Sequence, residues 1–526
     1  GSMLLYSLLH LTGYPLPLEE VKGFRQWGTL TPGHPESHLT PGVETTTGPL
    51  GQGISNAVGM AIAEAHLAAR YNRPGFDIVD HYTYVLVGDG DLMEGVSFEA
   101  CSLAGHLGLG KLIAFYDDNR ICLSGSTVLS FSENVLDRFQ AIGWHIQEVK
   151  NGEDLEEIGK AIEQAQKETG RPSLIKVRTT IGYGSPHKQG TSEAHGSPLG
   201  ADEVKATKAA LGWPTEPDFL IPEDVAAHMR SALVRGGEAE EKWNQRLQEY
   251  AVAYPVEYRE FQRIQSGVLP EGWDKDFPQY AADAKGVATR KASETMLQLL
   301  ASRIPELMGG AADLNPSTFT WMKKQGDFQS TQAPAAGIQG TVGGPWGYIG
   351  RNIHFGVREH AMGSIVNGLL LHGGLRSFGS TFLVFADYMR PAVRLSAIMK
   401  IPAIWVFTHD GIGVGEDGPT HQAVEHYAAL RAIPNLLFLR PCDANETVYA
   451  WKMALENNSR PTVLALTRQN VPTIDRTKYA SAEGLLRGAY LLNPLPAGQL
   501  PDMILIASGS EVSVILGAEA LLAQKG

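Results

Sequence analysis

The feature that most constrains the fold is the stretch 81–121, in which two apolar segments flank one helical segment. His81–Val87 and Leu112–Tyr116 have the composition of buried parallel strands, and Ser97–Ala104 between them reads as a helix. Parallel strands joined through a helix form a βαβ unit, whose sheet must be covered by helices. The stretch therefore predicts an α/β domain built on an open parallel sheet.

Both predicted strands end in polar residues. Gly88-Asp89-Gly90 follows the first strand as a predicted turn, and Asn119 follows the second. Because ligands bind outside the carboxyl ends of strands in open α/β sheets, we expect Asp89 and Asn119 to face each other. Their side-chain oxygens suit Mg²⁺, and glycines let the backbone approach phosphates that complete its shell. A magnesium diphosphate site is one interpretation, and an ordinary strand-end Asp with a turn Asn is the other.

The alternation of helices and strands continues on both sides of this unit. In the first part of the chain we predict helices at Leu4–Tyr14, Ile54–Ala69, Glu133–Gly143 and Asp154–Thr169, and a strand at Ser173–Arg178. Charged helices at Glu238–Tyr250 and Val256–Gln265 follow. Farther on we predict helices from Arg290, from Glu359 and at Glu511–Lys525, and strands at Asn352–Val357, Ile404–Thr408 and Met503–Ala507. Phe319–Arg351 reads as an irregular loop.

This pattern predicts α/β organisation with two doubly wound parallel-sheet domains and the start of a third α/β domain. The expected boundaries are residues 1–200 for the first domain, 201–284 for a helical connector, 285–480 for the second domain and 481–526 for the third. We expect the first and third domains to be incomplete. One βα unit at the end of the chain is too little for a domain.

Composition narrows the classes of function. A net charge of -13 argues against wholesale binding to nucleic acid or an anionic membrane, although a local basic cluster can hold a sugar phosphate. Three cysteines cannot all pair and indicate a reducing compartment. No apolar run reaches the ~18 residues of a membrane span. We therefore expect a cytoplasmic protein, with an organelle address in a missing amino-terminal segment as the alternative.

Several segments allow both a functional interpretation and a purely structural one. Gly48–Gly53 opens a helix and can take an anion on its backbone N–H groups, or it can serve tight helix packing. His34, between glycine and proline, is an exposed loop histidine or a ligand contact. Arg290 opens a helix and can hold a phosphate bidentately, or it lies on the surface.

Two further groups follow strands of the second domain. Phe382, Phe385 and Tyr388 are spaced as an aromatic stripe of a helix, which alone predicts core packing. His409, Asp417 and His421 follow a predicted strand and suit either a metal or sugar hydroxyls. We favour hydroxyls, because no third histidine or cysteine accompanies them and Mg²⁺ has its oxygen ligands elsewhere.

The combination of motifs resembles the transketolase family. Gly-Asp-Gly followed about thirty residues later by Asn is similar to the thiamine diphosphate motif. The segments that resemble transketolases are Glu44–Gly53, Gly182–Ser185, His195-Gly196, Gly356–Glu359, Thr408–Asp410 and Gly415–Gln422. The likeness runs from Gly1 to Gly526 in the same order.

The resemblance implies an enzyme that moves a two-carbon ketol unit from a ketose phosphate, such as xylulose 5-phosphate, to an aldose phosphate, such as ribose 5-phosphate. Its cofactors would be thiamine diphosphate, acting as an ylid, and Mg²⁺, for which Ca²⁺ or Mn²⁺ can substitute. Dihydroxyacetone synthase and phosphoketolase share much of the motif set and are alternatives. A catalytically silent thiamine-binding scaffold is the alternative from a different class.

The resemblance also assigns the site residues. The metal ligands would be Asp89, Asn119 and the carbonyl of Ile121. The cofactor contacts would be Gly48, Pro49, Leu50, Gly90, Glu94, Asn119, His195, Asp313, Glu359, Phe382, Phe385 and Tyr388. The substrate contacts would be His34, His195, Arg290, Ser317, His409, Asp417, His421 and Arg468. The catalytic residues would be Glu359, His421, His195 and His34.

Glu359 carries the mechanism that the resemblance implies. Its carboxylate would share a proton with the pyrimidine ring, favouring the imino tautomer that deprotonates the thiazolium carbon. The alternative is a helix-start carboxylate favoured by the helix dipole. Members of this family join the first domain of one subunit to the second domain of another, with a residue resembling Glu94 linking the paired sites. We therefore expect a homodimer with active sites at its interface.

Overall fold

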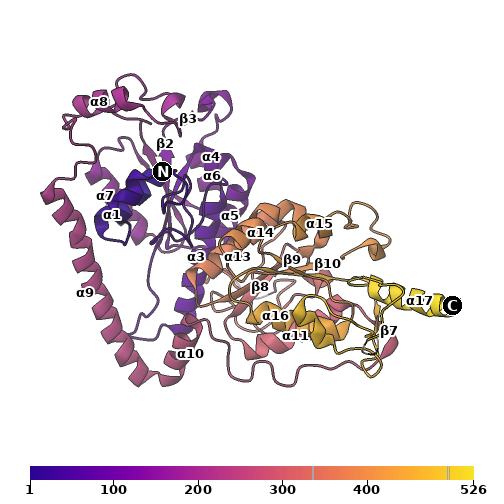
Figure 1. The fold of residues 1–526 in the computed structure, drawn as a ribbon. Coiled ribbons are helices and arrows are strands. Elements are labelled where there is room, and N and C mark those ends of the chain that lie inside the picture. Colours follow the sequence, from indigo (N-terminus) through magenta and orange to yellow (C-terminus); the bar gives the residue numbers. More distant parts are fainter. Residues whose placement is uncertain (334–336, 495, 497, 526) are drawn as a thin grey trace. The chain divides into compact units, whose positions relative to one another are not determined.

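The computed structural model describes residues 1–333, 337–494, 496 and 498–525. Its contacts divide the chain into two compact units, Gly1–Tyr258 and Arg259–Gly526, each built on a parallel sheet (Figure 1). Within the described ranges, no helix combines the length and apolar character needed to cross a membrane. The α/β fold class with parallel sheets is confirmed.

The first unit alternates helices and strands as the sequence predicts. Its helices are α1 Ser2–Thr12, α2 Leu18–Lys22, α3 Gln52–Tyr71, α4 Asp89–Met93, α5 Gly95–Leu107, α6 Val135–Ala141, α7 Leu155–Lys167, α8 Ala201–Ala210 and α9 Glu223–Ala253, and α10 Pro255–Gln265 crosses the division between the units. Its strands are β1 Thr83–Gly88, β2 Leu112–Asp118, β3 Ile121–Cys122, β4 Gly125–Ser126, β5 His145–Val149 and β6 Ser173–Arg178.

The main sheet of this unit has the order β1-β2-β6-β5 with every pair parallel. Its core joins Ile113 and Ile175 of the sheet to Ala161 and Ala165 of α7. The register pairs Thr83 with Leu112 and Gly88 with Asp117, so β1 and β2 end side by side. This pairing brings the polar residues after both strands to one edge of the sheet.

Three local predictions in this unit need correction. Gly88-Asp89-Gly90 is not a free turn, because Gly88 ends β1 and Asp89 begins the short helix α4. The sequence prediction missed β5, whose outer position leaves four of its five residues only partly buried or exposed. The predicted helix at Glu238–Tyr250 is the second half of α9, a single helix of 31 residues.

The second unit is also α/β. Its helices are α11 Thr289–Arg303, α12 Asn315–Thr318, α13 Glu359–His372, α14 Ala386–Ile398, α15 His426–Arg431, α16 Ala444–Glu456 and α17 Glu511–Ala523. Its strands are β7 Asp283–Val287, β8 Leu307–Ala311, β9 Arg376–Phe382, β10 Ile404–Thr408, β11 Leu437–Leu439, β12 Thr462–Leu466 and β13 Val471–Thr473.

Five strands form its central parallel sheet in the order β11-β12-β10-β9-β8. Figure 1 shows α13 and α14 on one face of this sheet and α11 and α16 on the other. Every residue of β9, β10 and β12 is buried, as expected for strands covered on both sides. One core cluster joins Met296 and Leu300 of α11 to Phe378, Val406 and Trp451.

Two predicted strands of this unit are wrong. Asn352–Val357 forms only isolated bridges, in which Ile353 N–H donates to Gly309 O at 2.9 Å. It turns away because Gly356 has a left-handed backbone, with φ +67°. Met503–Ala507 pairs with no described strand, and Ile504 and Ile506 are 70% and 88% exposed. An apolar, β-branched segment forms a strand only where a neighbouring strand supplies hydrogen-bond partners for its backbone.

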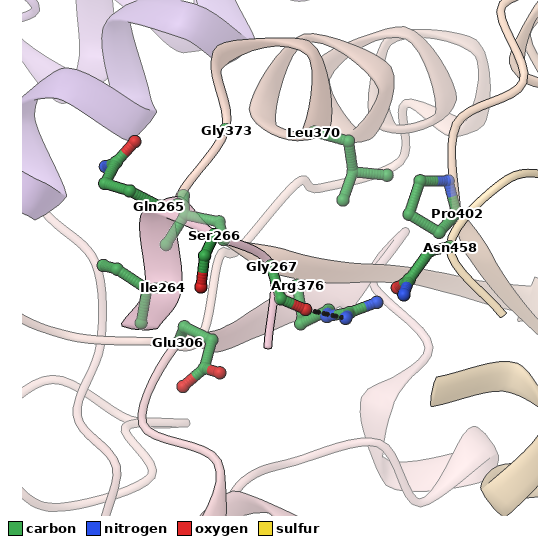
Figure 2. A pocket seen from close by; sticks show the side chains of 12 residues that line it. Ile264, Gln265, Ser266, Gly267, Glu306, Leu370, Gly373, Arg376, Pro402 and Asn458 are labelled. Atoms are coloured by element: carbon green, nitrogen blue, oxygen red, sulfur yellow. Dashed lines mark hydrogen bonds between the residues drawn. The ribbon is translucent and has the colours of Figure 1, made fainter. Parts of the chain in front are cut away.

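Two arginines and a glutamate lie at the amino edge of the central sheet, and Figure 2 labels Arg376 and Glu306 among them. Arg263 pairs bidentately with Glu306, with N–O distances of 2.6 and 2.9 Å. Arg376, the first residue of β9, is only 6% exposed. These charges lie at the opposite end of the strands from the polar residues that follow β8, β9 and β10.

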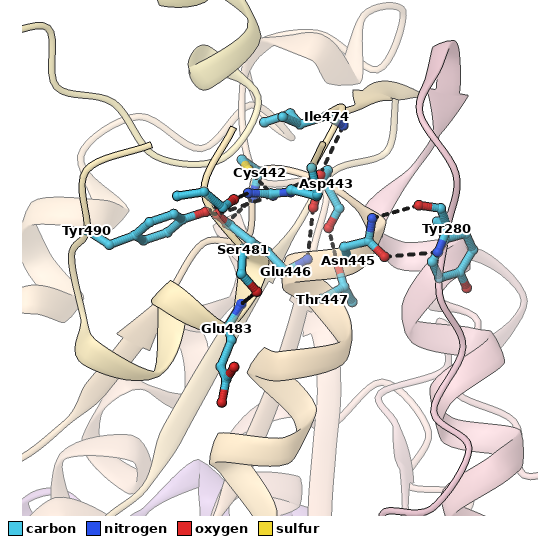
Figure 3. Close-up of polar contacts among 12 residues, drawn as sticks. Tyr280, Cys442, Asp443, Asn445, Glu446, Thr447, Ile474, Ser481, Glu483 and Tyr490 are labelled. Atoms are coloured by element: carbon cyan, nitrogen blue, oxygen red, sulfur yellow. Dashed lines mark hydrogen bonds and ion pairs between the residues drawn. The ribbon is translucent and has the colours of Figure 1, made fainter. Parts of the chain in front are cut away.

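A buried polar network fixes the chain after β13 to the start of α16 (Figure 3). The Asp443 carboxylate caps α16 by accepting from Glu446 N at 2.8 Å, and it also accepts from Ile474 N and Arg476 Nη2 at 3.1 and 3.0 Å. Tyr490 donates to Glu446 Oε1 at 2.5 Å. The segment 474–490, which includes the start of the predicted third domain, is therefore tied to the second unit by charge-assisted hydrogen bonds.

Candidate active site

The carboxylate of Asp89 is the centre of the site in the first unit. Asp89 begins α4 and is only 4% exposed. Tyr116 of β2 donates to Oδ1 at 2.5 Å, whereas Oδ2 is buried and has no partner among the described residues. Burial raises the pKa of Asp89, and the nearby Asp118 and Asp117 add to this effect while Tyr116 opposes it. A buried carboxylate oxygen without a donor fits a cation that completes the site.

Asn119 and Ile121 lie in the loop that follows β2. Asn119 Oδ1 accepts from Ile121 N at 2.9 Å. The parallel register of β1 and β2 brings the segments that carry the three predicted metal ligands to the same edge of the sheet. The set supplies a carboxylate, an amide and a carbonyl oxygen, which suit Mg²⁺.

The glycine-rich loop before α3 packs directly on this group. Gly51 N donates to Asp91 Oδ1 at 3.1 Å, and Asp91 Oδ2 accepts from Gly88 N at 2.9 Å. A Cβ on Gly90 would lie 2.9 Å from Leu50, and a Cβ on Gly51 would lie 2.9 Å from Glu94. The loop 48–51, Gly90 and Glu94 are therefore neighbours, and any side chain at the two glycines would separate them.

The two predicted histidines of this unit lie on adjoining loops. A Cβ on Gly48 would lie 3.1 Å from the His34 ring, so this exposed imidazole borders the glycine-rich loop. Arg25 fills the space beside Gly33 and donates to Gly196 O at 3.1 Å. His195 Nδ1 is buried without a partner among the described residues. Arg25 thus connects the His34 and His195 loops.

The second unit has a cavity of about 470 Å³ at the carboxyl edge of its sheet. All six substrate contacts predicted in this unit line it, together with Pro316, Phe319 and Phe382; the six are Arg290, Ser317, His409, Asp417, His421 and Arg468. They come from α11, α12 and the segments after β10 and β12. Residues separated by up to 178 positions in the sequence therefore meet in one polar cavity.

Two guanidinium groups give this cavity its charge. Arg290 donates to Ser317 O at 2.5 Å and lies over the Phe319 ring, 4.9 Å from its centroid. Burial and the neighbouring Arg468 lower the pKa of Arg290. Arg468 pairs with Glu416, which is largely exposed. Two cations this close favour a dianionic ligand such as a phosphate monoester.

His409 is held neutral inside the cavity. It is 2% exposed, and burial together with Arg290, Arg468 and His421 lowers its pKa from the ordinary 6.5 to about 3. Its Nδ1 is 2.8 Å from Thr408 Oγ1, and its ring stacks on Phe382 with centroids 3.7 Å apart. A neutral imidazole can hydrogen-bond a hydroxyl without adding a third positive charge.

The three aromatic residues do not form a helical stripe. Phe382 ends β9, Phe385 ends a 3-10 turn and Tyr388 lies in α14. Their rings form a chain, with centroid distances of 5.8 Å for the first pair and 6.0 Å for the second, and Phe385 also contacts His421 at 5.3 Å. Tyr388 is 66% exposed, so core packing does not account for it. The row instead presents an aromatic surface beside the cavity.

Glu359 and Asp313 follow other segments of this unit. Glu359 is the first residue of α13 and is half-buried. Asp313 is exposed and, like Phe319 and His409, has a left-handed backbone, with φ between 58 and 60° for the three. Such strain in residues other than glycine is typical of functional sites.

Several supporting residues were not predicted. Asp91 holds the glycine-rich loop, Tyr116 holds Asp89, and Phe319 packs on Arg290. The Gly-Asp-Gly-Asp pattern offered a signal for Asp91, because a carboxylate three residues after Gly88 can accept from its N–H. Tyr116 and Phe319 had no comparable local signal.

Two family models match the chain. The model of the thiamine diphosphate-binding domain of transketolase covers residues 1–270, and that of the transketolase pyrimidine-binding domain covers residues 285–473. The two predicted cofactor-binding domains are therefore both matched, in the expected order.

Whole-chain comparisons agree with the family models. The transketolases of Halalkalibacterium halodurans and Geobacillus stearothermophilus are 55% and 53% identical over all of this chain and 76% of their own length. A transketolase of Pichia stipitis, solved with xylulose-5-phosphate, is 48% identical with a TM-score of 0.93 over 99% of this chain and 75% of that one. The chain therefore belongs to the transketolase family of thiamine diphosphate-dependent transferases.

Proposed function

We propose that this enzyme transfers a two-carbon ketol unit from ketose phosphates such as xylulose 5-phosphate to aldose phosphates such as ribose 5-phosphate. The observation that carries the proposal is that Arg290, Arg468 and His409 line the same cavity. It combines two cations for a phosphate with neutral groups for hydroxyls. Pichia stipitis transketolases have been solved with xylulose-5-phosphate, fructose-6-phosphate and sedoheptulose-7-phosphate, which are all sugar phosphates.

The metal and diphosphate are assigned to the first unit. Asp89, Asn119 and the Ile121 carbonyl would hold Mg²⁺, because Asp89 Oδ2 is a buried acceptor without a donor. The diphosphate would lie beside the loop containing Gly48, Pro49 and Leu50 and beside Gly90, where a Cβ would collide with Leu50. When bound, thiamine diphosphate supplies a carbon nucleophile for ketose carbonyls.

The pyrimidine end of the cofactor is assigned to the second unit. Phe382, Phe385 and Tyr388 offer aromatic surface for its ring, and Asp313 offers a further contact. Glu359 would hold a proton at a ring nitrogen, from the first turn of α13. The helix dipole at this position stabilises the carboxylate form that must accept that proton.

Different side chains would recognise the phosphate and the hydroxyl groups of the substrate. Arg290, Arg468 and Ser317 would bind the phosphate, whereas His409 and Asp417 would bind hydroxyls. Because Nδ1 of neutral His409 is engaged with Thr408, its Nε2 is the nitrogen for the sugar. His421 would move protons at the reacting carbons, and its contacts with Phe385 and Phe382, both assigned to the cofactor, support this role.

His34 and His195 complete the proposal from the first unit, as further substrate contacts and proton carriers. We also propose a homodimer whose interface holds the active sites, with Glu94 linking the two sites. In this arrangement residues 1–200 bind the diphosphate, 285–480 bind the pyrimidine and 481–526 begin a third domain. Sedimentation equilibrium should show a dimer, and turnover assays should show that this dimer is fully active. A fully active monomer would contradict the proposed dimer.

A cytoplasmic location is part of the proposal and fits three free thiols.

A product assay separates the proposed reaction from its alternatives. With xylulose 5-phosphate and ribose 5-phosphate, thiamine diphosphate and Mg²⁺, the proposal predicts sedoheptulose 7-phosphate and glyceraldehyde 3-phosphate in equal amounts. Acetyl phosphate formed from xylulose 5-phosphate in a parallel reaction that contains inorganic phosphate would identify a phosphoketolase. Strong preference for formaldehyde as acceptor would identify a dihydroxyacetone synthase. Cofactor binding without any of these products would identify a silent scaffold.

A further inference from the structure

The second unit contains another cavity, at the amino edge of its sheet (Figure 2). Its volume is about 260 Å³, and its lining includes Gly267, Glu306, Leu370, Arg376, Pro402 and Asn458. Strand β9 runs from Arg376 in this cavity to Phe382 in the substrate cavity. Six steps along a strand span roughly 20 Å. The two cavities are therefore separate.

Arg376 is a buried cation with unused donors. Its Nη2 donates to Gly267 O at 2.7 Å. Over the part of the chain that the structure describes, this is the only acceptor bonded to its guanidinium, which has five N–H groups. In Figure 2 the guanidinium lies between the Gly267 carbonyl and the Asn458 side chain. Arg376 is only 6% exposed and lines the cavity, so its remaining donors border that space.

The nearest carboxylate does not neutralise this cation. Both oxygens of Glu306 are engaged by Arg263, at 2.6 and 2.9 Å. Among the described residues, no carboxylate oxygen lies within 4.0 Å of the Arg376 guanidinium. Arg376 lines the cavity together with one carboxylate, Glu306, which Arg263 engages from outside the lining. Burial lowers the pKa of Arg376, while Glu306 opposes this effect and Arg263 adds to it.

The rest of the wall matches a small organic anion. Ser266, Gln265 and Asn458 supply neutral polar groups, while Leu370, Leu375 and Pro402 supply apolar surface. A guanidinium with free N–H groups pairs bidentately with carboxylate or phosphate. We propose that this cavity is a second binding site, for a small organic anion whose carboxylate or phosphate pairs with Arg376. This site is independent of the proposed substrate site.

Calorimetric titration of the holoenzyme tests the proposal. Benzoate and inorganic phosphate are titrated separately, and any binding in the substrate cavity is recognised because Arg290→Met weakens it. We expect one site per chain for at least one probe, with benzoate alone indicating a carboxylate ligand and phosphate alone a phosphate ligand. Arg376→Met should weaken binding by about tenfold or more, because a charge-assisted hydrogen bond is lost. Arg290→Met, which alters the other cavity, is the matched control and should leave this binding unchanged.

A second variant keeps the test decisive if Arg376→Met fails to fold. Asn458 is exposed and makes no hydrogen bond through its side chain with the described residues, so Asn458→Asp should fold normally. The added negative charge should weaken binding of the probe while turnover stays unchanged. No saturable binding of either probe would overturn the proposal. Equal binding to the wild type, Arg376→Met and Asn458→Asp would also overturn it.

Discussion

Replacing Arg290 by methionine tests the phosphate assignment. The side chain donates to Ser317 O at 2.5 Å, stacks on Phe319 and shares the cavity with Arg468. Methionine keeps much of the apolar volume against Phe319 and removes the charge. The expected effect is therefore loss of a charged hydrogen bond to the substrate phosphate, while Arg468 still supplies one cation.

The magnitude follows from the strength of such bonds. A hydrogen bond to a charged group contributes about 1.5–3 kcal/mol, which corresponds to roughly a 10- to 150-fold change in binding. We expect KM for xylulose 5-phosphate to rise by that factor with a smaller change in kcat.

The assay compares a phosphorylated donor with an unphosphorylated one. KM for xylulose, the same ketose without its phosphate, should stay within about twofold of the wild type, because Arg290 then has no anionic group to bind. Lys291→Met is the matched control, since Lys291 is the next residue of α11 and is exposed. An equal rise in KM for both donors would refute the reasoning, as would a similar effect of Lys291→Met.

Three further predictions concern other groups of the second unit. Glu359→Ala should abolish turnover while calorimetry still detects Mg²⁺-dependent diphosphate binding, and unchanged turnover would contradict its role. Because His409 has a folded pKa of about 3 against an ordinary 6.5, the unfolded chain binds more protons between these values. Wild-type stability should therefore fall as the pH drops through this window, by up to about 1.4 kcal/mol per unit, and denaturant titrations of His409→Gln should lack that component. Arg440→Met should cost about 3–5 kcal/mol in unfolding experiments, because Arg440 Nε donates to the fully buried Asp410 at 2.7 Å. The double variant with Asp410→Asn should recover most of this loss, and additive losses would contradict the pairing.

Predictions from the sequence were most accurate where the local residue pattern and the parallel pairing of strands determine the structure together. Asp89 and Asn119 follow the ends of β1 and β2, which are parallel neighbours in register, as a βαβ unit already implies. The strand Ile404–Thr408 was predicted with its observed bounds, because an apolar run flanked by proline and polar residues has few alternatives. Helix starts at Glu359 and near Arg290 were also found from local patterns.

The sequence alone predicted the fewest contacts where segments far apart in the chain pack together. Asp91 holds Gly51 across 40 positions, and Arg440 bonds Asp410 and Glu511 across 30 and 71 positions. Nothing local marks such pairs. Asn352–Val357 and Met503–Ala507 have strand composition but lack full strand partners, and partners are a property of the tertiary structure. The unused donors of Arg376 became visible only with their surroundings.

The central claim is that the chain takes a two-carbon unit from a ketose phosphate and holds it until an acceptor arrives. The most direct measurement is a rapid-quench experiment with holoenzyme, xylulose 5-phosphate and inorganic phosphate in the absence of an aldose phosphate acceptor. We predict a burst of one glyceraldehyde 3-phosphate per occupied cofactor site, with sedoheptulose 7-phosphate formed only after ribose 5-phosphate is added. Release of acetyl phosphate, or the absence of a burst in enzyme shown by calorimetry to be loaded with thiamine diphosphate and Mg²⁺, would contradict the claim.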